Sequence, residues 1–337
     1  MLNALIQLTF FTTKAIIIVI LLLVLLGGIL ALLSKGKEKL KGRIQIKNLN
    51  KNYQETTEAL FSEILPKEQL KQFLKKQKAD EKTKTKLAGK HSDKNIFVIH
   101  FDGDIKATAV TALREEITAI LGVAKTSDEV VVCLESGGGM VHAYGLAAAQ
   151  LARLRQQHIP LTVIVDKVAA SGGYLMASVA NKILAAPFAI IGSIGVIIQL
   201  PNFNRYLKEK HIDFEQLTAG GFKRTLTMFG KNTEEGRDKL QHEIEEIHTL
   251  FKNAIMQYRG HMDIQKVSTG EHWLGTQAFE YKLIDEIKTS DDYLLEKSKE
   301  CNLFEIRYAT KKTLGSKLSS VMNNIKQNYF SSQYIVS

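Results

Sequence analysis

Three observations predict an α/β domain built from largely parallel βαβ units and preceded by one N-terminal transmembrane helix. Short apolar runs alternate with longer helical patterns from residue 95 onward. Glycine-containing turns follow several of these apolar runs, and one uncharged apolar stretch lies near the N-terminus. Strands that alternate with helices at this spacing are typical of parallel sheets.

The apolar stretch at residues 15–33 is predicted to be a retained membrane anchor within a segment of residues 1–34. As a helix it would reach about 28 Å, close to the ~30 Å hydrocarbon core of a bilayer. It is longer than the apolar core of a signal peptide, and no Ala-x-Ala site follows it. The lysines that follow it favour a cytoplasmic position for the C-terminal flank.

Three further regions follow the anchor. Residues 35–94 are a basic juxtamembrane region and linker, in which residues 53–73 predict an amphipathic helix broken at Pro66. Residues 95–290 form the α/β domain, with predicted strands at 96–101, 129–134, 161–165 and 182–186 and predicted helices at 107–121, 141–155, 171–180, 202–210 and 234–258. Residues 291–337 are a C-terminal extension with a strand-like piece at 303–308.

A second apolar stretch, at residues 183–200, has two possible interpretations. It contains Pro187 and four polar or glycine positions, which are Gly192, Ser193, Gly195 and Gln199. We expect a buried strand-loop-strand here, with a second membrane span as the alternative.

The composition excludes several classes of protein. Two cysteines, Cys133 and Cys301, are too few for a disulfide framework. No Cys/His cluster has metal-ligand spacing, and no phosphate-binding loop is present, so we expect no metal, cofactor or ATP requirement. The net charge of +10 comes mostly from residues 35–94, where 17 Lys and Arg stand against 8 Asp and Glu. Beside an anchor, this excess favours anionic lipid over nucleic acid.

Two glycine turns offer groups suited to acyl transfer. The turn at residues 134–141 reads Leu-Glu-Ser-Gly-Gly-Gly-Met-Val, and the amide of Gly138 or Gly139 is a candidate oxyanion donor. In the second turn, Ser171 precedes a predicted helix, where it is either an ordinary N-cap or an exposed nucleophile. The Gly172 N–H at the positive end of that helix would then stabilise an oxyanion.

Lys223 is the candidate base, since it follows Gly220-Gly221-Phe222 in a flexible turn. A lysine accepts a proton near neutral pH only if its pKa falls from ~10.4, through burial or a nearby positive charge. Phe222 and Arg224 are the expected sources of these two effects. Among the histidines, His142 is the best-placed rival base, but no acidic neighbour would orient it.

Five segments together resemble the SohB and signal peptide peptidase A family of membrane-anchored Ser/Lys peptidases. They are residues 135–148, 169–174, 192–196, 219–223 and 273–278. The resemblance implies a ClpP/crotonase-like fold, with Ser171 as nucleophile and Lys223 as general base. It further implies that Ser193 orients the lysine and that Gly172 and the Gly138/Gly139 turn form the oxyanion hole.

The sequence departs from the family pattern at one position, and the membrane side expected from the family disagrees with the charge pattern. Gly137 stands where the family usually has proline, which leaves the turn less restricted in the unfolded chain. The family's signal peptide peptidases are thought to face the periplasm, whereas the local charge pattern favours the cytoplasm. We expect a bacterial inner membrane, and the two observations differ only on the side that the catalytic domain faces.

The residues and the resemblance together predict a membrane-bound, ATP-independent serine endopeptidase. The resemblance further implies ring-like homo-oligomers, with signal-peptide remnants and unfolded or membrane-associated proteins as substrates. Two alternatives keep the fold: a crotonase-type acyl-CoA enzyme with Glu135 as the nearest candidate base, and a catalytically weak membrane scaffold that presents the helix at residues 234–258 to partners.

Overall fold

A computed structural model describes residues 9, 11–23, 42–76 and 94–309 of the chain. The chain divides into two compact units, and Ile44–Tyr308 is the larger one. In the smaller unit, residues 11–23 are helical. They include only the first part of the predicted anchor, because residues 24–33 lie outside the described ones. Among the described residues, no helix has both the length and the apolar character needed to cross a membrane.

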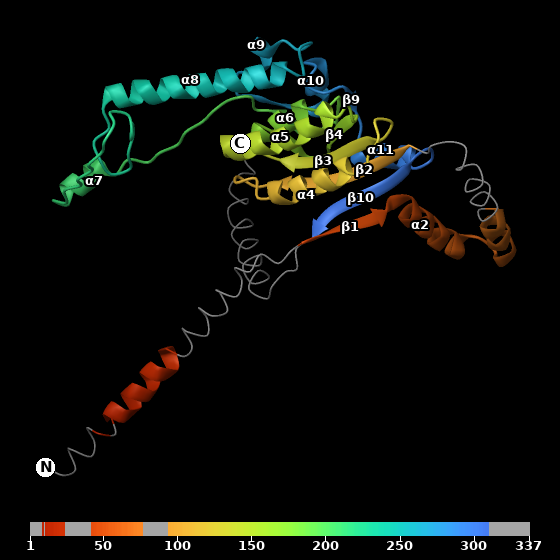
Figure 1. Cartoon of the computed structure of the whole chain (residues 1–337), viewed down its shortest axis with the longest axis horizontal. Helices are drawn as coiled ribbons and strands as arrows, with labels where there is room; N and C mark the ends of the chain where they lie inside the picture. Colours follow the sequence, from red (N-terminus) through yellow and green to blue (C-terminus); the bar gives the residue numbers. More distant parts are fainter. Residues whose placement is uncertain (1–8, 10, 24–41, 77–93, 310–337) are drawn as a thin grey trace. The chain divides into compact units, whose positions relative to one another are not determined.

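A mostly parallel sheet forms the centre of the larger unit, in the strand order β1-β10-β2-β3-β4-β6-β9 (Figure 1). Its strands are β1 (Arg43–Asn48), β2 (Asn95–Gly103), β3 (Glu129–Ser136), β4 (Leu161–Val165), β6 (Lys182–Ala185), β9 (Glu286–Ile287) and β10 (Asn302–Ala309). The pairs from β10 through β9 are parallel, as the alternation of strands and helices predicts. The prediction of an α/β domain is confirmed. The sheet extends beyond residues 95–290 at both ends, because β1 and β10 belong to it.

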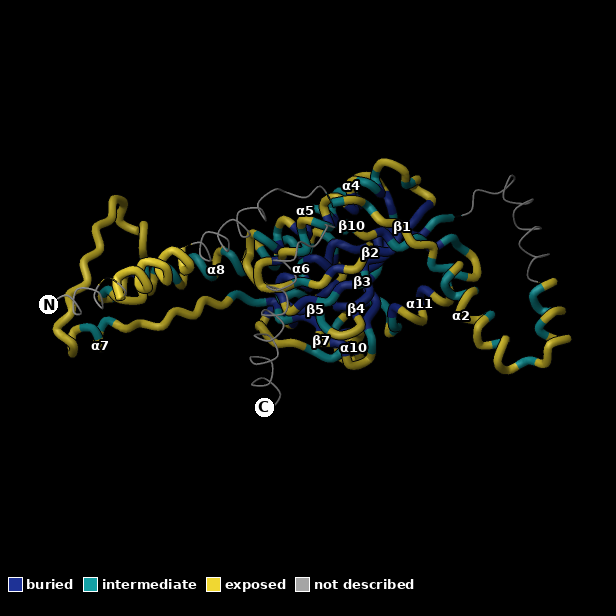
Figure 2. The backbone as a smooth tube through the Cα atoms, turned by 90° about the horizontal axis from the view of Figure 1, so that it is seen from below, coloured by how far each residue is buried: buried dark blue, intermediate teal, exposed yellow. Residues whose placement is uncertain are grey.

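Alternate residues along the strands face two different apolar layers. In β2, Phe97, Ile99 and Phe101 enter the larger core. There they meet α4 (Val110–Leu121), α5 (Val141–Gln156), α6 (Gly172–Ser178) and one end of α8 (Glu234–Met256). Their neighbours Ile96 and Val98 face the smaller core, which α11 (Ser290–Lys297) and the start of α2 (Leu49–Ile64) cover. Figure 2 shows that the buried part of the chain is concentrated in β2, β3 and β4.

A short second layer branches from the end of β3. β5 (Val168–Ala170) pairs with β3 at Ser136 and also with β7 (Ile190–Gly192), which in turn pairs antiparallel with β8 (His272–Leu274). The sequence analysis did not identify β5 or β8, because strands of three residues are too short for a periodic signal. This layer brings the ends of β3, β5 and β7 together.

Three expectations about individual elements have definite outcomes. The helix expected at residues 107–121 begins at Val110, because Ala107 has φ 48° and the Asp104 carboxylate binds the N–H and hydroxyl of Thr108. Residues 183–200 contain β6 and β7 joined by a loop, so the expected strand-loop-strand is present, but the expected burial is wrong for Phe188, Ile197 and Leu200, which are exposed. The amphipathic pattern at residues 53–73 lies in α2 and in a helical segment at 67–76, separated at Pro66 as expected.

The segment between β7 and α8 extends away from the sheet. It carries α7 (Asn204–Glu209), which both views place far from β2, β3 and β4 (Figures 1 and 2). Many of its apolar side chains are exposed, among them Ile197, Phe203, Tyr206, Phe214 and Leu217. We call residues 197–233 the arm.

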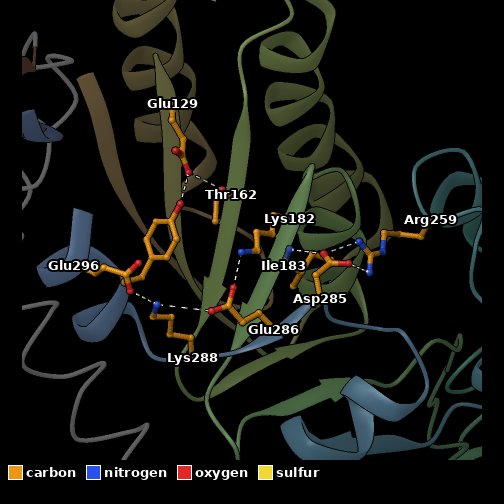
Figure 3. A network of polar contacts seen from close by, with 10 residues as sticks. Glu129, Thr162, Lys182, Ile183, Arg259, Asp285, Glu286, Lys288 and Glu296 are labelled. Carbon is orange, nitrogen blue, oxygen red and sulfur yellow. Dashed lines mark hydrogen bonds and ion pairs between the residues drawn. The ribbon is translucent and has the colours of Figure 1, made fainter. Parts of the chain in front are cut away.

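Polar contacts connect the strands to one another and to α11, on the face of the sheet opposite to α5 and α6 (Figure 3). The Glu129 carboxylate accepts hydrogen bonds from Tyr293 at 2.6 Å, from Thr162 at 2.8 Å and from Lys94 at 2.8 Å. Burial alone would raise the pKa of Glu129, but these hydrogen bonds outweigh it and hold the pKa below its ordinary value. One carboxylate thus links β2, β3, β4 and α11.

A second group joins the chain after α8 to the edge of the sheet. The buried Arg259 guanidinium donates to both carboxylate oxygens of Asp285, at 2.8 and 2.9 Å, and to the Lys282 carbonyl. Asp285 also accepts the Ile183 N–H at 2.8 Å (Figure 3). The neighbouring Glu286 makes a more exposed ion pair with Lys182.

Asp285 and Glu286 provide a matched pair for testing this network. Asp285→Ala leaves the buried Arg259 charge unpaired, so we expect a loss of about 3–5 kcal/mol in the free energy of unfolding. Glu286→Ala removes a partly exposed ion pair, and we expect a loss of about 0–1 kcal/mol. Urea denaturation of both variants measures the difference. Equal losses would contradict the assignment of the Arg259–Asp285 pair as the stabilising one.

Candidate active site

Ser171 lies at the corner between β5 and α6 in a strained backbone conformation. Its φ is 52° and its ψ is −120°, a combination that non-glycine residues rarely adopt. Two backbone bonds hold the corner: the Ser171 N–H donates to the Gly192 carbonyl at 2.8 Å, and the Leu175 N–H donates to the Ser171 carbonyl at 3.0 Å. Ser171 makes no side-chain cap bond to α6, so the simple N-cap interpretation does not apply.

The glycine turn after β3 packs directly against this corner. Gly138 has φ 86°, and a Cβ atom there would lie 2.7 Å from the Gly172 nitrogen and 2.8 Å from the Ser171 Cβ. A Cβ on Gly139 would lie 2.1 Å from the Ile105 carbonyl oxygen. The structure therefore brings the three candidate glycines and Ser171 into one place, and only glycine fits at Gly138 and Gly139.

The amides of these glycines differ in their hydrogen bonding. The Gly138 N–H donates to the Ser136 hydroxyl at 3.1 Å. The N–H groups of Gly139 and Gly172 have no hydrogen-bond partner among the described residues. Gly172 is the first residue of α6, where a free N–H is expected and where the helix end favours negative charge.

Ser193 reaches the same place from the end of β7. It directly follows Gly192, whose carbonyl holds the Ser171 N–H, and its own N–H donates to the Glu271 carbonyl at 2.7 Å. Ser193 has φ 49°. The glycine-containing segment at residues 192–196 thus lies beside the Ser171 corner.

A mostly apolar cavity of about 280 Å³ opens beside Ser171. Its walls come from the glycine turn, α5, α6, the loop after β7 and one face of α8. The residues lining it are Gly139, Val141, Tyr144, Gly145, Ser171, Gly172, Leu175, Gly195, Val196, Ile197, Ile247, Leu250, Phe251 and Ala254.

The sequence analysis missed two parts of this cavity. The α8 residues Ile247, Leu250, Phe251 and Ala254 repeat at helical spacing, a signal that indicated an apolar face without saying what it covers. Tyr144 is fully buried in α5, and nothing in the sequence distinguished it from an ordinary core aromatic.

The structure does not place Lys223 at this site. The side chain is exposed on the arm and is not among the residues that line the Ser171 cavity. Phe222 is 54% exposed, with the Lys239 ammonium 5.9 Å from its ring centroid, so the expectation that Phe222 buries Lys223 is wrong. Arg224 is exposed too.

The remaining candidates do not contribute. His142 is exposed in the first turn of α5 and does not line the cavity. Within the part of the chain that the structure describes, no group of three or more His, Cys, Asp or Glu residues is arranged to hold a metal ion. Glu135 forms an ion pair with Lys167 at 2.9 Å, away from the cavity walls.

Two family models cover nearly all of the described α/β unit. The model described as "Peptidase family S49 N-terminal" matches residues 3–151, and the one described as "Peptidase family S49" matches residues 153–303. The "Probable protease SohB" of Haemophilus influenzae is 49% identical over 298 residues, which cover 86% of this chain and 84% of that protein. The protein of the same description from Buchnera aphidicola subsp. Acyrthosiphon pisum is 56% identical, covering 71% of each chain. A "Putative signal peptide peptidase SppA" of Enterococcus faecium is 29% identical over 52% of this chain and 51% of its own.

Two adjacent glycines test the packing of the turn. Gly138→Ala places a Cβ against the Ser171 corner at an unfavourable φ, so we expect a loss of at least about 1–2 kcal/mol in the free energy of unfolding. Gly137 has no atom within 4 Å of its Cβ position and no left-handed φ, so Gly137→Ala is expected to be neutral or to stabilise by about 0.4–1 kcal/mol. Urea denaturation compares them, and a similar cost for both would contradict the described turn.

Proposed function

The chain belongs to peptidase family S49 as a SohB-like protease, and from this premise we propose that it is a serine endopeptidase with Ser171 as nucleophile and Lys223 as general base. The observation that carries the proposal is the strained Ser171 corner, placed between an apolar cavity and two backbone N–H groups without partners among the described residues. Such a site suits attack on a carbonyl carbon and stabilisation of the oxyanion that forms.

The proposed reaction has two halves. In the first, the neutral Lys223 amine takes the Ser171 proton while Oγ attacks the peptide carbonyl, and the N–H groups of Gly172 and the Gly138/Gly139 turn bind the oxyanion. The protonated lysine then gives its proton to the leaving amine, and the acyl-enzyme remains. In the second half, water attacks the ester while the same lysine takes a proton from the water, and the lysine then returns that proton to Ser171 Oγ as the acid leaves. Ser193 would orient the lysine.

Lys223 lies on the arm, so the proposed dyad requires that the arm bring Lys223 to Ser171. Because Lys223 is exposed and away from the cavity, one chain in the described conformation lacks a base at Ser171. The arm also exposes a series of apolar side chains, among them Phe203, Phe214 and Leu217, of a kind that protein interfaces bury. We therefore propose a ring-like homo-oligomer in which the arm of one subunit brings Lys223 to Ser171 of its neighbour.

The residues that line the cavity indicate which class of substrate it would bind. Its walls from α8 are aliphatic or aromatic, and Gly145 and Ala254 leave room between them. Such a pocket favours an apolar side chain next to the scissile bond. Remnants of signal peptides and unfolded or membrane-associated proteins expose such side chains, and we propose them as substrates of an ATP-independent reaction.

We further propose that residues 15–33 anchor the protein in a bacterial inner membrane. The uncharged apolar stretch and the basic residues after it support this, and the relatives named above come from bacteria. We assign the domain to the ClpP/crotonase-like class, for which the parallel sheet with its short branching layer is the support. The acyl-CoA alternative lacks a base at the cavity, since Glu135 is paired with Lys167. A scaffold role leaves the strained Ser171 corner unexplained.

Replacing each member of the proposed dyad tests the function and the subunit arrangement together. Ser171→Ala and Lys223→Ala are each expected to lower cleavage of an unfolded protein by at least about 10³-fold, because they remove nucleophile and base. A fluorophosphonate probe should label Ser171 of the wild type.

Mixing the two inactive variants distinguishes the two ways of forming the dyad. In a ring, co-assembled subunits contain some sites with Ser171 from one chain and Lys223 from the next, so partial activity should return. Full activity in either single variant would refute the dyad. Absence of any recovery in confirmed mixed oligomers would refute the contribution between subunits.

Gly145 offers a test of the substrate pocket. It lines the cavity from α5, and no atom lies within 4 Å of its Cβ position. Gly145→Leu is therefore expected to fold, since leucine is also the better helix former, and to fill the cavity. Cleavage of peptides with a large apolar residue before the scissile bond should fall about 10- to 200-fold relative to peptides with alanine there. An unchanged preference would contradict the assigned pocket.

A further inference from the structure

The hydroxyl of Tyr144 lies within a chain of hydrogen bonds that runs from the glycine turn to the Asp104 carbonyl. The Gly138 N–H donates to Ser136 Oγ at 3.1 Å, Ser136 Oγ lies 2.5 Å from the Tyr144 hydroxyl, and that hydroxyl donates to the Asp104 carbonyl at 2.8 Å. We propose that Tyr144 is the positioning residue of the oxyanion hole, holding both of its halves at fixed geometry. This inference rests on the proposed function.

The available protons indicate which group donates in each of these hydrogen bonds. Tyr144 has one hydroxyl proton, which goes to the Asp104 carbonyl. The Tyr144 oxygen, at 2.5 Å, is then a closer acceptor for the Ser136 proton than the Gly103 carbonyl, at 3.4 Å, and a Ser136 lone pair accepts the Gly138 N–H. Burial raises the pKa of Tyr144, which keeps its proton in place. Every donor in the chain has an acceptor, so the Gly138 peptide has one preferred orientation.

The ring of the same tyrosine supports the other half of the oxyanion hole. A Cβ on Gly172 would lie 2.4 to 2.9 Å from Tyr144 side-chain atoms, so the first residue of α6 rests directly on this side chain. Tyr144 is fully buried and also lines the cavity beside Ser171. One side chain thus contacts the Gly172 half through its ring and the Gly138 half through its hydroxyl.

Glycine residues near Ser136 and Tyr144 leave space for this hydrogen-bonded arrangement. At Gly103, a Cβ would lie 2.5 Å from both Ser136 Oγ and the Tyr144 hydroxyl, so any larger residue there would displace them. The turn itself lacks a proline, because Gly137 occupies the position where proline would restrict it. The hydrogen bonds of Ser136 and Tyr144 restrict the turn in the folded protein instead.

Deleting single hydroxyls tests the proposal. Tyr144→Phe keeps the ring against Gly172 and removes the hydroxyl, and Ser136→Ala breaks the same chain at its other member. The matched control is Tyr293→Phe, which removes another buried tyrosine hydroxyl, the one that donates to Glu129 on the far side of the sheet. All are made in the full chain, with circular dichroism and thermal unfolding to confirm folding.

Two measurements follow on each variant. The first is amide hydrogen exchange in the peptide spanning residues 135–142, which needs no enzyme activity. The second is the rate of fluorophosphonate labelling at Ser171, with kcat and KM for a peptide measured alongside, both normalised to folded protein.

We expect Tyr144→Phe and Ser136→Ala to speed exchange of this peptide about fivefold or more, as for loss of one hydrogen bond. They should slow labelling about 10- to 100-fold and lower kcat similarly, with KM changed less than about threefold. The double variant should be no slower than the slower single variant, because both break one chain. Tyr293→Phe should leave labelling and exchange unchanged.

Three outcomes would overturn the proposal. Unchanged exchange in Tyr144→Phe would show that the hydroxyl does not hold the turn. Faster exchange with wild-type labelling and kcat would show a structural role only. A wild type that neither labels at Ser171 nor cleaves peptides would refute the proposed function, and with it a positioning role in that function, whatever the exchange shows.

Discussion

Close contact between two strand-to-helix turns, possible only with glycine, is the constraint on which the candidate site depends. The turn after β3 and the corner after β5 approach until the Gly138 backbone touches Ser171 and Gly172. The pairing of β3 with β5 at Ser136 and Ala169 fixes this approach, and the next pairing, of β5 with β7, places Ser193 beside it. A side chain at Gly138 would separate the turns, so the spacing between Ser171 and these amides is determined by direct backbone contact.

The sheet separates the site from the polar groups that hold the larger unit together. The glycine turns and the cavity lie with α5, α6 and α8, on the face that Phe97 and Ile99 enter. Glu129, with its three hydrogen bonds, lies between the strands and α11 on the other face, and Arg259 with Asp285 joins the chain after α8 to β6. The second of these contacts matters for the site indirectly. It fixes the end of α8 whose apolar face closes the cavity.

The sequence predicted the parts of the fold that carry a local signal. Long helices and buried strands were located within a few residues, and Ser171, Gly172, Gly138 and Ser193 meet as expected from turns that follow strands. What could not be predicted depends on distant contacts. β5 and β8 are too short to show a period, Tyr144 looks like any core aromatic in α5, and the place of Lys223 depends on the path of the arm. A glycine-flanked lysine identifies a turn, but no local pattern says where that turn lies.

The exposed position of Lys223 and the apolar cavity at Ser171 are complementary in the proposed dyad. A lysine in water is a hydrated ammonium ion with no lone pair to accept a proton, and removal from water is what makes it a base. The arm offers no such environment, since Phe222 and Arg224 are themselves exposed. The Ser171 cavity does, because Leu175, Ile247 and Phe251 line it. Docking of an arm at a neighbouring cavity would therefore deliver the lysine and desolvate it in the same event. On this argument, the proposed site at the strained Ser171 corner would acquire its base only when subunits assemble.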